Sequence, residues 1–81
     1  MDRKDYLERM QRAIVSQANR GTVAPEDTVK YNGNRFYPCG YELTFDERGK
    51  TIHLAILHDL KANSVLRCKL EQVEGGQGHE G

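Results

Sequence analysis

The spacing of hydrophobic residues changes once along the chain. In the N-terminal quarter, apolar side chains recur at three- and four-residue steps, the spacing of one helix face, and form the stripe Tyr6, Leu7, Met10, Ala13, Ile14 and Ala18. Asp2 is a candidate N-cap, and Gly21 can adopt the left-handed conformation that ends a helix. These signals predict a helix over residues 2–20 and a linker over residues 21–27. Two i,i+4 ion pairs are expected along the helix, Asp5 with Arg9 and Glu8 with Arg12.

Beyond residue 27 hydrophobic and polar residues alternate, which is the period of a half-buried strand. Val29 and Tyr31 flank Lys30 in a first strand, and Asn32-Gly33 is a type I′ hairpin signal. The predicted second strand covers residues 35–45 and bends at Pro38-Cys39-Gly40, because proline cannot donate to a ladder and glycine permits a bulge. Further strands are expected over residues 50–58 and 65–70, joined by a loop in which Asn63 is a candidate for positive φ. Residues 70–73 then suit one helical turn or a last short strand.

The register of the second hairpin follows from burial. A two-residue Glu47-Arg48 loop places Leu43 opposite Ile52 and Tyr41 opposite Leu54, which gathers hydrophobic side chains on one face. A shift by one residue sets Ile52 against Thr44 instead. The first register is the prediction, although Gly49 would suit a bulged turn.

These elements define an α+β protein that is mainly β: an N-terminal amphipathic helix plus a small antiparallel sheet of four or five strands. A sheet this small must curl or be covered to bury one face, and the bend offers a corner. We therefore expect one domain over residues 1–73, with a β-meander over 28–73 and a disordered tail over 74–81. The alternative is an open antiparallel sheet with the helix packed across it.

Two resemblances add to this interpretation. The order of a long bent hairpin, a further strand and a terminal single turn over residues 28–73 resembles SH3-like barrels of the Tudor kind. The segment FYPCGYELTFDERGKTIHLAILHDLKANSV resembles small proteins of prophages and mobile elements of Gram-positive bacteria, a group with no assigned activity.

Composition narrows the classes of function. Twelve basic and twelve acidic residues cancel among 81, whereas proteins that live on nucleic acid or anionic membranes usually carry a basic excess. The longest apolar run, residues 54–57, is far too short to span a bilayer. No secretory signal is visible and two cysteines make no disulfide framework, so we expect a reduced bacterial cytoplasmic protein without membrane contact.

Chemistry-bearing residues are present but poorly spaced for catalysis or metal binding. His53 and His58 lie five apart on one strand and should face opposite sides, and no C-x-x-C or H-x3-H spacing joins them to Cys39 and Cys68. His58, Asp59 and Ser64 lack a nucleophile elbow, so Asp59 and Asn63 are expected to bond loop amides instead. We expect no enzyme, metal site or cofactor.

Aromatic and basic residues give the remaining candidates. Tyr31, Tyr41 and Phe45 share a parity with Leu43 and are expected to fill the core, whereas Phe36 and Tyr37 must point to opposite faces. The candidate recognition surface consists of Lys30, Arg35, Tyr37, Arg67 and Lys69. The leading hypothesis is a module that binds a protein or peptide, as a monomer or weak homodimer. The alternative is a nucleic-acid-binding accessory protein of a phage or mobile element, since basic side chains interleaved with a ring suit single strands.

Overall fold

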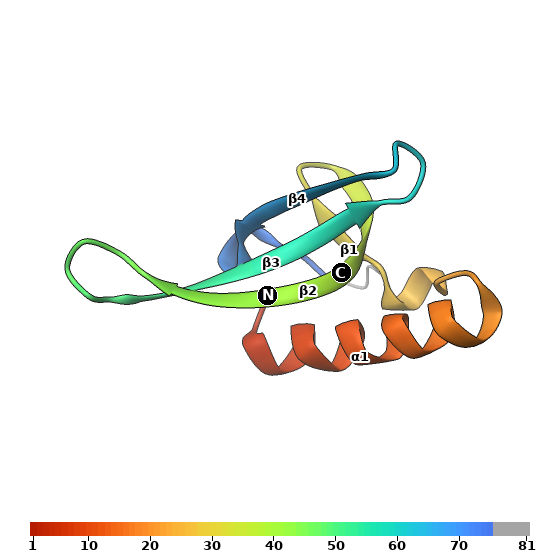
Figure 1. Ribbon diagram of the computed structural model, residues 1–81, viewed down its shortest axis with the longest axis horizontal. Coiled ribbons are helices and arrows are strands. Elements are labelled where there is room, and N and C mark those ends of the chain that lie inside the picture. The colour runs from red at the N-terminus through yellow and green to blue at the C-terminus, as the bar shows by residue number, and fades with distance from the viewer. Residues whose placement is uncertain (76–81) are drawn as a thin grey trace.

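One α-helix and four strands make up the part of the protein that the structure describes, which is α+β and mainly β (Figure 1). The computed structural model describes residues 1–75. The elements are α1 (Arg3–Arg20), the 3₁₀ turn η1 (Pro25–Asp27), β1 (Val29–Tyr31), β2 (Asn34–Phe45), β3 (Thr51–Asp59), β4 (Ser64–Lys69) and the 3₁₀ turn η2 (Leu70–Gln72). The strands form one antiparallel sheet in the order β1-β2-β3-β4, curled into a half-barrel. None of the helices within residues 1–75 combines the length and hydrophobicity needed to cross a bilayer.

The ends of α1 form as their residues predict. The Asp2 carboxylate accepts from the backbone N–H of Asp5 at 3.4 Å, and Gly21 takes φ 75° at the C-terminus, where its N–H donates to the Gln17 carbonyl. The linker that follows is shorter than expected, because η1 forms within it. Positive φ at Asn32, Gly33 and Asn63 confirms the two predicted turn positions in the sheet.

The core lies on the inner, concave side of the curled sheet, where α1 packs. Tyr6 and Ala13 are the buried helix residues, and Tyr6 joins a cluster with Val29, Phe36, Ala55, Leu57, Cys68, Leu70 and Val73. The C-terminal part of the predicted helix stripe does not join this cluster: Ile14 is 41% exposed, and Ala18 is exposed as well.

The predicted register of the β2–β3 hairpin is wrong by one residue. Thr44 pairs with Ile52 and Leu43 with His53. The cause is the turn: the Asp46 N–H donates to the Lys50 carbonyl, and Gly49 has φ 81°, which gives a bulged turn one residue longer than the two-residue loop. Ile52 therefore lies on the outer side of the sheet, away from α1.

The bend in β2 is confirmed as a bulge between Pro38 and Gly40, within one continuous strand. β1 pairs only with residues 34–36, so Pro38 has a partner strand on one side alone. Gly40 is needed there, since a Cβ would lie 3.1 Å from the Ile56 side chain. The bulge also brings the Gly40 carbonyl within 2.6 Å of the Tyr6 hydroxyl, which donates to it.

Two of the residues expected in the core are exposed. Phe45 is 62% exposed and Leu43 51%, while Tyr41 is half-buried. The end of the β2–β3 hairpin projects beyond α1 (Figure 1), so α1 does not cover its inner side. Tyr31 lies at the margin of the core and packs against it. The alternation of residues along β2 predicts the correct face for these side chains, but it does not show how far along the strand α1 covers that face.

The C-terminal end of the described chain closes the sheet. Lys30 and Glu74 form an isolated antiparallel bridge, with N···O distances of 2.9 and 2.8 Å. Residues 70–73 thus give a helical turn that leads directly into this bridge. The prediction of a tail from residue 74 is wrong for Glu74 and Gly75, and residues 76–81 lie outside the described part of the chain.

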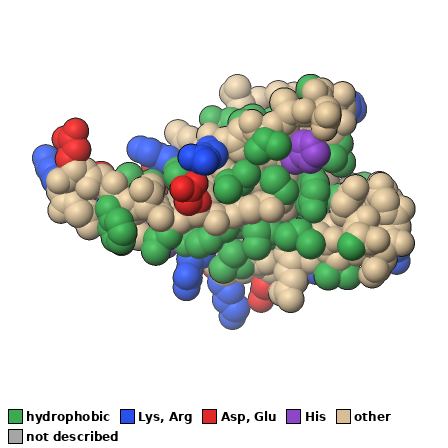
Figure 2. Space-filling model, in the orientation of Figure 1, with side chains coloured by type: hydrophobic (Ala, Val, Ile, Leu, Met, Phe, Trp, Pro, Cys, Tyr) green, Lys and Arg blue, Asp and Glu red, His purple; other side chains and the backbone are tan. Residues whose placement is uncertain are grey.

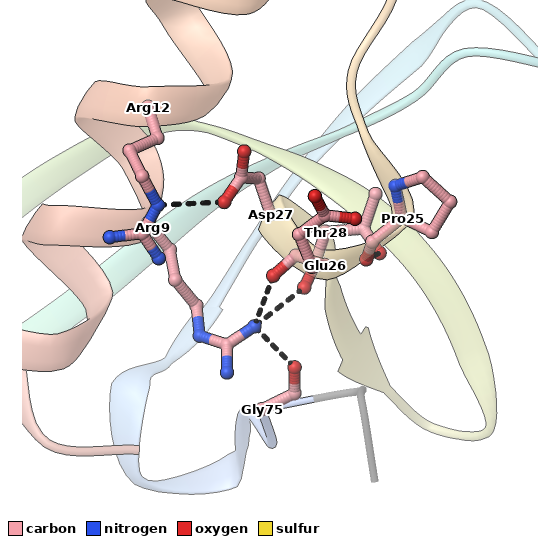
Figure 3. Close-up of polar contacts among 7 residues, drawn as sticks. All are labelled: Arg9, Arg12, Pro25, Glu26, Asp27, Thr28 and Gly75. Atoms are coloured by element: carbon pink, nitrogen blue, oxygen red, sulfur yellow. Dashed lines mark hydrogen bonds and ion pairs between the residues drawn. The ribbon is translucent and has the colours of Figure 1, made fainter.

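Two arginines of α1 fasten the helix to the rest of the chain (Figure 3). Arg9 Nη1 donates to the carbonyls of Glu26 (2.9 Å), Thr28 (3.2 Å) and Gly75 (2.7 Å). Arg12 Nε donates to the buried Asp27 at 2.8 Å. The expected pairs along the helix are therefore replaced by contacts with η1 and with the C-terminal bridge.

Candidate functional site

The side of the sheet turned away from α1 carries all five residues of the predicted recognition surface. Cross-strand partners point to the same face, so the register places Lys30 beside Arg35, and Arg67 and Lys69 across from Ile56 and Leu54. We call this side the outer face; its members are Lys30, Arg35, Tyr37, Glu42, Thr44, Ile52, Leu54, Ile56, His58, Val65, Arg67 and Lys69.

Hydrophobic side chains gather on the outer face. Ile52, Leu54 and Ile56 follow one another along β3, all partly exposed, and Val65 on β4 is 60% exposed. Figure 2 shows hydrophobic side chains over the labelled strands of Figure 1, with charged side chains and a histidine among them. β3 is therefore apolar on both sides, although α1 covers only one.

Charges are distributed unevenly around these hydrophobic residues. Glu42 and Asp59 are the only acidic residues of β1–β4. Asp59 pairs with Ser64, and its Oδ1 accepts from the backbone N–H of Lys61 (3.0 Å) and Ala62 (3.3 Å), as predicted for this loop. Four basic residues against the single acid Glu42 make the outer face positive, even though the whole chain is neutral.

Arg35 and Tyr37 share a concave surface at one end of the outer face. We call it the turn hollow; it measures about 450 Å³ and is lined by Gly33, Asn34, Arg35, Tyr37, His58, Asp59, Leu60 and Lys61. The β1–β2 and β3–β4 turns form its walls. Lys30, Arg67 and Lys69 lie on the outer face but not in the hollow.

The rings of Tyr37 and His58 form one side of the turn hollow. Their centroids are 6.1 Å apart with the planes tilted by 39°. Burial, with a smaller contribution from Cys39, raises the pKa of the Tyr37 phenol, so this side chain stays a neutral hydroxyl. His58 Nε2 lies 3.3 Å from Asn63 Oδ1, within hydrogen-bonding distance. Arg35 is anchored by a bond to Thr28 Oγ1 at 3.2 Å.

Sequence reasoning missed His58 and Lys61 as neighbours of Tyr37. The pairing of Tyr37 with His58 depends on the bulge at Cys39, which shifts the register of every residue before it. The hairpin pattern indicated that such a bulge exists but not how many residues it displaces.

The remaining chemistry-bearing residues are separated. His53 bonds through Nδ1 to the Tyr41 hydroxyl on the inner face, opposite to His58 as predicted. Cys39 and Cys68 are free thiols, and burial raises the pKa of both. Within residues 1–75, no three His, Cys, Asp or Glu side chains are placed to hold a metal ion.

Comparison of the chain with protein-family models, with curated proteins and with solved structures finds no match. Its function therefore has to be argued from the surface itself.

Proposed function

We propose that this chain is a non-enzymatic module that binds a segment of another protein through the outer face of its sheet. The observation that carries the proposal is the row Ile52, Leu54 and Ile56 with Val65, which stays partly exposed because α1 covers only the inner face. Contiguous exposed hydrophobic side chains rimmed by polar ones are typical of protein–protein contact sites.

A matched pair of substitutions tests this proposal. Val65 on the outer face and Phe45 on the inner face of the hairpin end are exposed to nearly the same extent, 60% and 62%. Peptides selected from a random display library on the full chain should bind Val65→Lys at least about tenfold more weakly than the native chain, the scale of one lost apolar contact. Phe45→Lys should bind them unchanged.

Two results would count against a protein-binding face. One is a selection in which no peptide is enriched. The other is a set of enriched peptides that bind Val65→Lys as tightly as the native chain. Circular dichroism of both variants shows that a change in binding does not come from loss of the fold.

The turn hollow favours a second candidate function, binding of single-stranded nucleic acid. Tyr37 and His58 offer stackable rings, and Arg35 and Lys61 lie beside them to contact phosphates. A fluorescent oligothymidine should then bind with an affinity that falls steeply as salt rises, and Tyr37→Ala with Arg35→Glu should abolish it. Affinity for a peptide docked on hydrophobic residues would hardly change with salt.

A further inference from the structure

Within the described part of the chain, the outer edge of β4 is open. β4 is the last strand of the sheet and pairs only with β3, and within residues 1–75 no backbone group outside this pair bonds to Ser64–Lys69. The other edge differs, because Glu74 bridges β1 through two backbone hydrogen bonds. In an open edge strand the N–H and C=O of every second residue point outward without a partner.

The side chains along this edge have a definite chemistry. The outer face takes every second side chain of this strand, namely Val65, Arg67 and Lys69. Leu66, between the first two, lies on the inner side and is half-buried. Arg67 Nε is 3.4 Å from Glu42 Oε1, a charge contact without hydrogen-bond alignment. The Arg67 side chain remains 64% exposed, so its other N–H groups can reach a second carboxylate.

We propose that β4 accepts an extended segment of a partner protein as a fifth strand, and that this segment alternates acidic and aliphatic residues. The inference rests on the proposed function, since it places the bound segment along the β4 edge that borders the outer face, with its carboxylates on that face. The backbone of the segment bonds to the open edge, its carboxylates lie beside Arg67 and Lys69, and its aliphatic side chains pack at Leu66.

Charge selects this occupant over a second copy of the chain. A symmetric β4–β4 pair would place the Arg67 and Lys69 side chains of both copies on the same side of one short ladder, and like charges so placed repel. An acidic strand meets the same two residues with attraction. Basic side chains on an edge strand also prevent unwanted pairing with other strands. Binding measurements distinguish this protective role from binding of an acidic segment.

The first experiment uses synthetic peptides and the full chain. A short peptide of alternating valine and glutamate should shift the backbone amide signals of β4 in NMR spectra. The matched peptide with lysine in place of glutamate should bind at least about tenfold more weakly. Two further versions of the glutamate peptide carry N-methyl groups at every second residue, one at the odd and one at the even positions. One version should lose binding and the other should keep it, because only one set of N–H groups faces β4.

The second experiment exchanges charge on the protein. The variant Arg67→Glu with Lys69→Glu should bind the glutamate peptide at least about tenfold more weakly than the native chain does. It should bind the lysine peptide more tightly than the native chain does. Lys4→Glu with Arg20→Glu changes the same number of charges at exposed positions of α1, away from the outer face, and should leave the affinity for the glutamate peptide unchanged.

The outcomes separate the two proposals. Any of three results would overturn strand addition at β4: no binding of the glutamate peptide, an equal loss of affinity in the Lys4 and Arg20 variant, or the same effect of N-methylation at both sets of alternate residues. Peptides from the display library that still depend on Val65 would then leave the outer-face function standing. If Val65→Lys has no effect on those peptides, the outer-face function fails, whatever happens at β4.

Discussion

Replacement of Tyr6 by phenylalanine removes one hydroxyl group from the centre of the core and leaves the ring in place. Tyr6 has no exposed surface, and its hydroxyl donates to the Gly40 carbonyl at 2.6 Å and lies 3.3 Å from the Ile56 carbonyl. Both carbonyls lie next to the bulge, where β2 and β3 change register. The substitution therefore tests whether α1 stabilises the bend or only covers it.

The expected loss of stability follows from the hydrogen bond. A buried hydrogen bond contributes about 1 kcal/mol net, and a carbonyl left without its partner adds to the loss, so Tyr6→Phe should destabilise the fold by about 2 kcal/mol. For a chain of this size that lowers the melting temperature by roughly 10 °C. Tyr31→Phe is the matched control, because the Tyr31 ring packs beside Phe36 and its hydroxyl makes no hydrogen bond within residues 1–75.

The same hydroxyl gives the prediction a pH dependence. Burial raises the pKa of Tyr6 far above its ordinary value, with smaller contributions from Cys39 and Cys68, so the folded state holds this proton more tightly than the unfolded state. The associated stability is fully present below the unfolded pKa of about 10 and is lost as the pH rises toward the folded value, by about 1.4 kcal/mol per unit. Phenylalanine has no such proton.

Urea unfolding between pH 7 and 11 measures both effects. The stability difference between the native chain and Tyr6→Phe should shrink by about 1.4 kcal/mol at pH 11, because only the native chain loses the contribution of this group. A difference that stays constant across this range, or a loss below about 0.5 kcal/mol at pH 7, would refute the role assigned to the hydroxyl.

Three further changes test other parts of the structure. Arg9→Met removes a charged donor from three carbonyls and should cost about 2–3 kcal/mol in urea unfolding; a loss below 1 kcal/mol would contradict this role. Gly40→Ala should cost about 1–3 kcal/mol because its Cβ meets Ile56, and the added Ile56→Ala should recover part of it. Raised pKa values should make iodoacetamide slow toward both thiols in the folded chain, with Cys39 modified before the more buried Cys68; equal rates in folded and urea-unfolded protein would contradict it.

The predictable parts of the fold are those that local chemistry determines. A helix cap at Asp2, a left-handed Gly21, the Asn32-Gly33 turn and the bulge beside Gly40 each depend on a few adjacent residues. The β2–β3 register was missed because two turns compete at the same sequence, and Gly49 selects the longer one. Burial patterns favoured the shorter loop on the assumption that Ile52 faces the core.

The errors in the core and in part of the candidate site have another cause. Alternation shows which side chains share a face, but not how far a helix reaches over the sheet. It therefore predicts Phe45 in the core, although α1 does not extend over the hairpin end. The Arg9 contacts join segments far apart in the chain and leave no local signal. Arg35 and Tyr37 were found as neighbours because they lie two apart on one strand. His58 and Lys61 come from another turn.

Net charge is a poor guide to the partner of a protein this small. The chain sums to zero, which by composition disfavours anionic partners, yet all four basic residues of β1–β4 point to the outer face, where Glu42 is the one acidic residue. At an ionic strength of 0.15 M, charges are screened beyond about 8 Å. A segment lying along β4 therefore interacts mainly with Arg67, Lys69 and Glu42, and at the Lys69 end also with Asp2 and Glu71, which line the same hollow as Lys69. The local surface, and not the total, decides which partner is attracted, and exchanging the charges of Arg67 and Lys69 changes that surface directly.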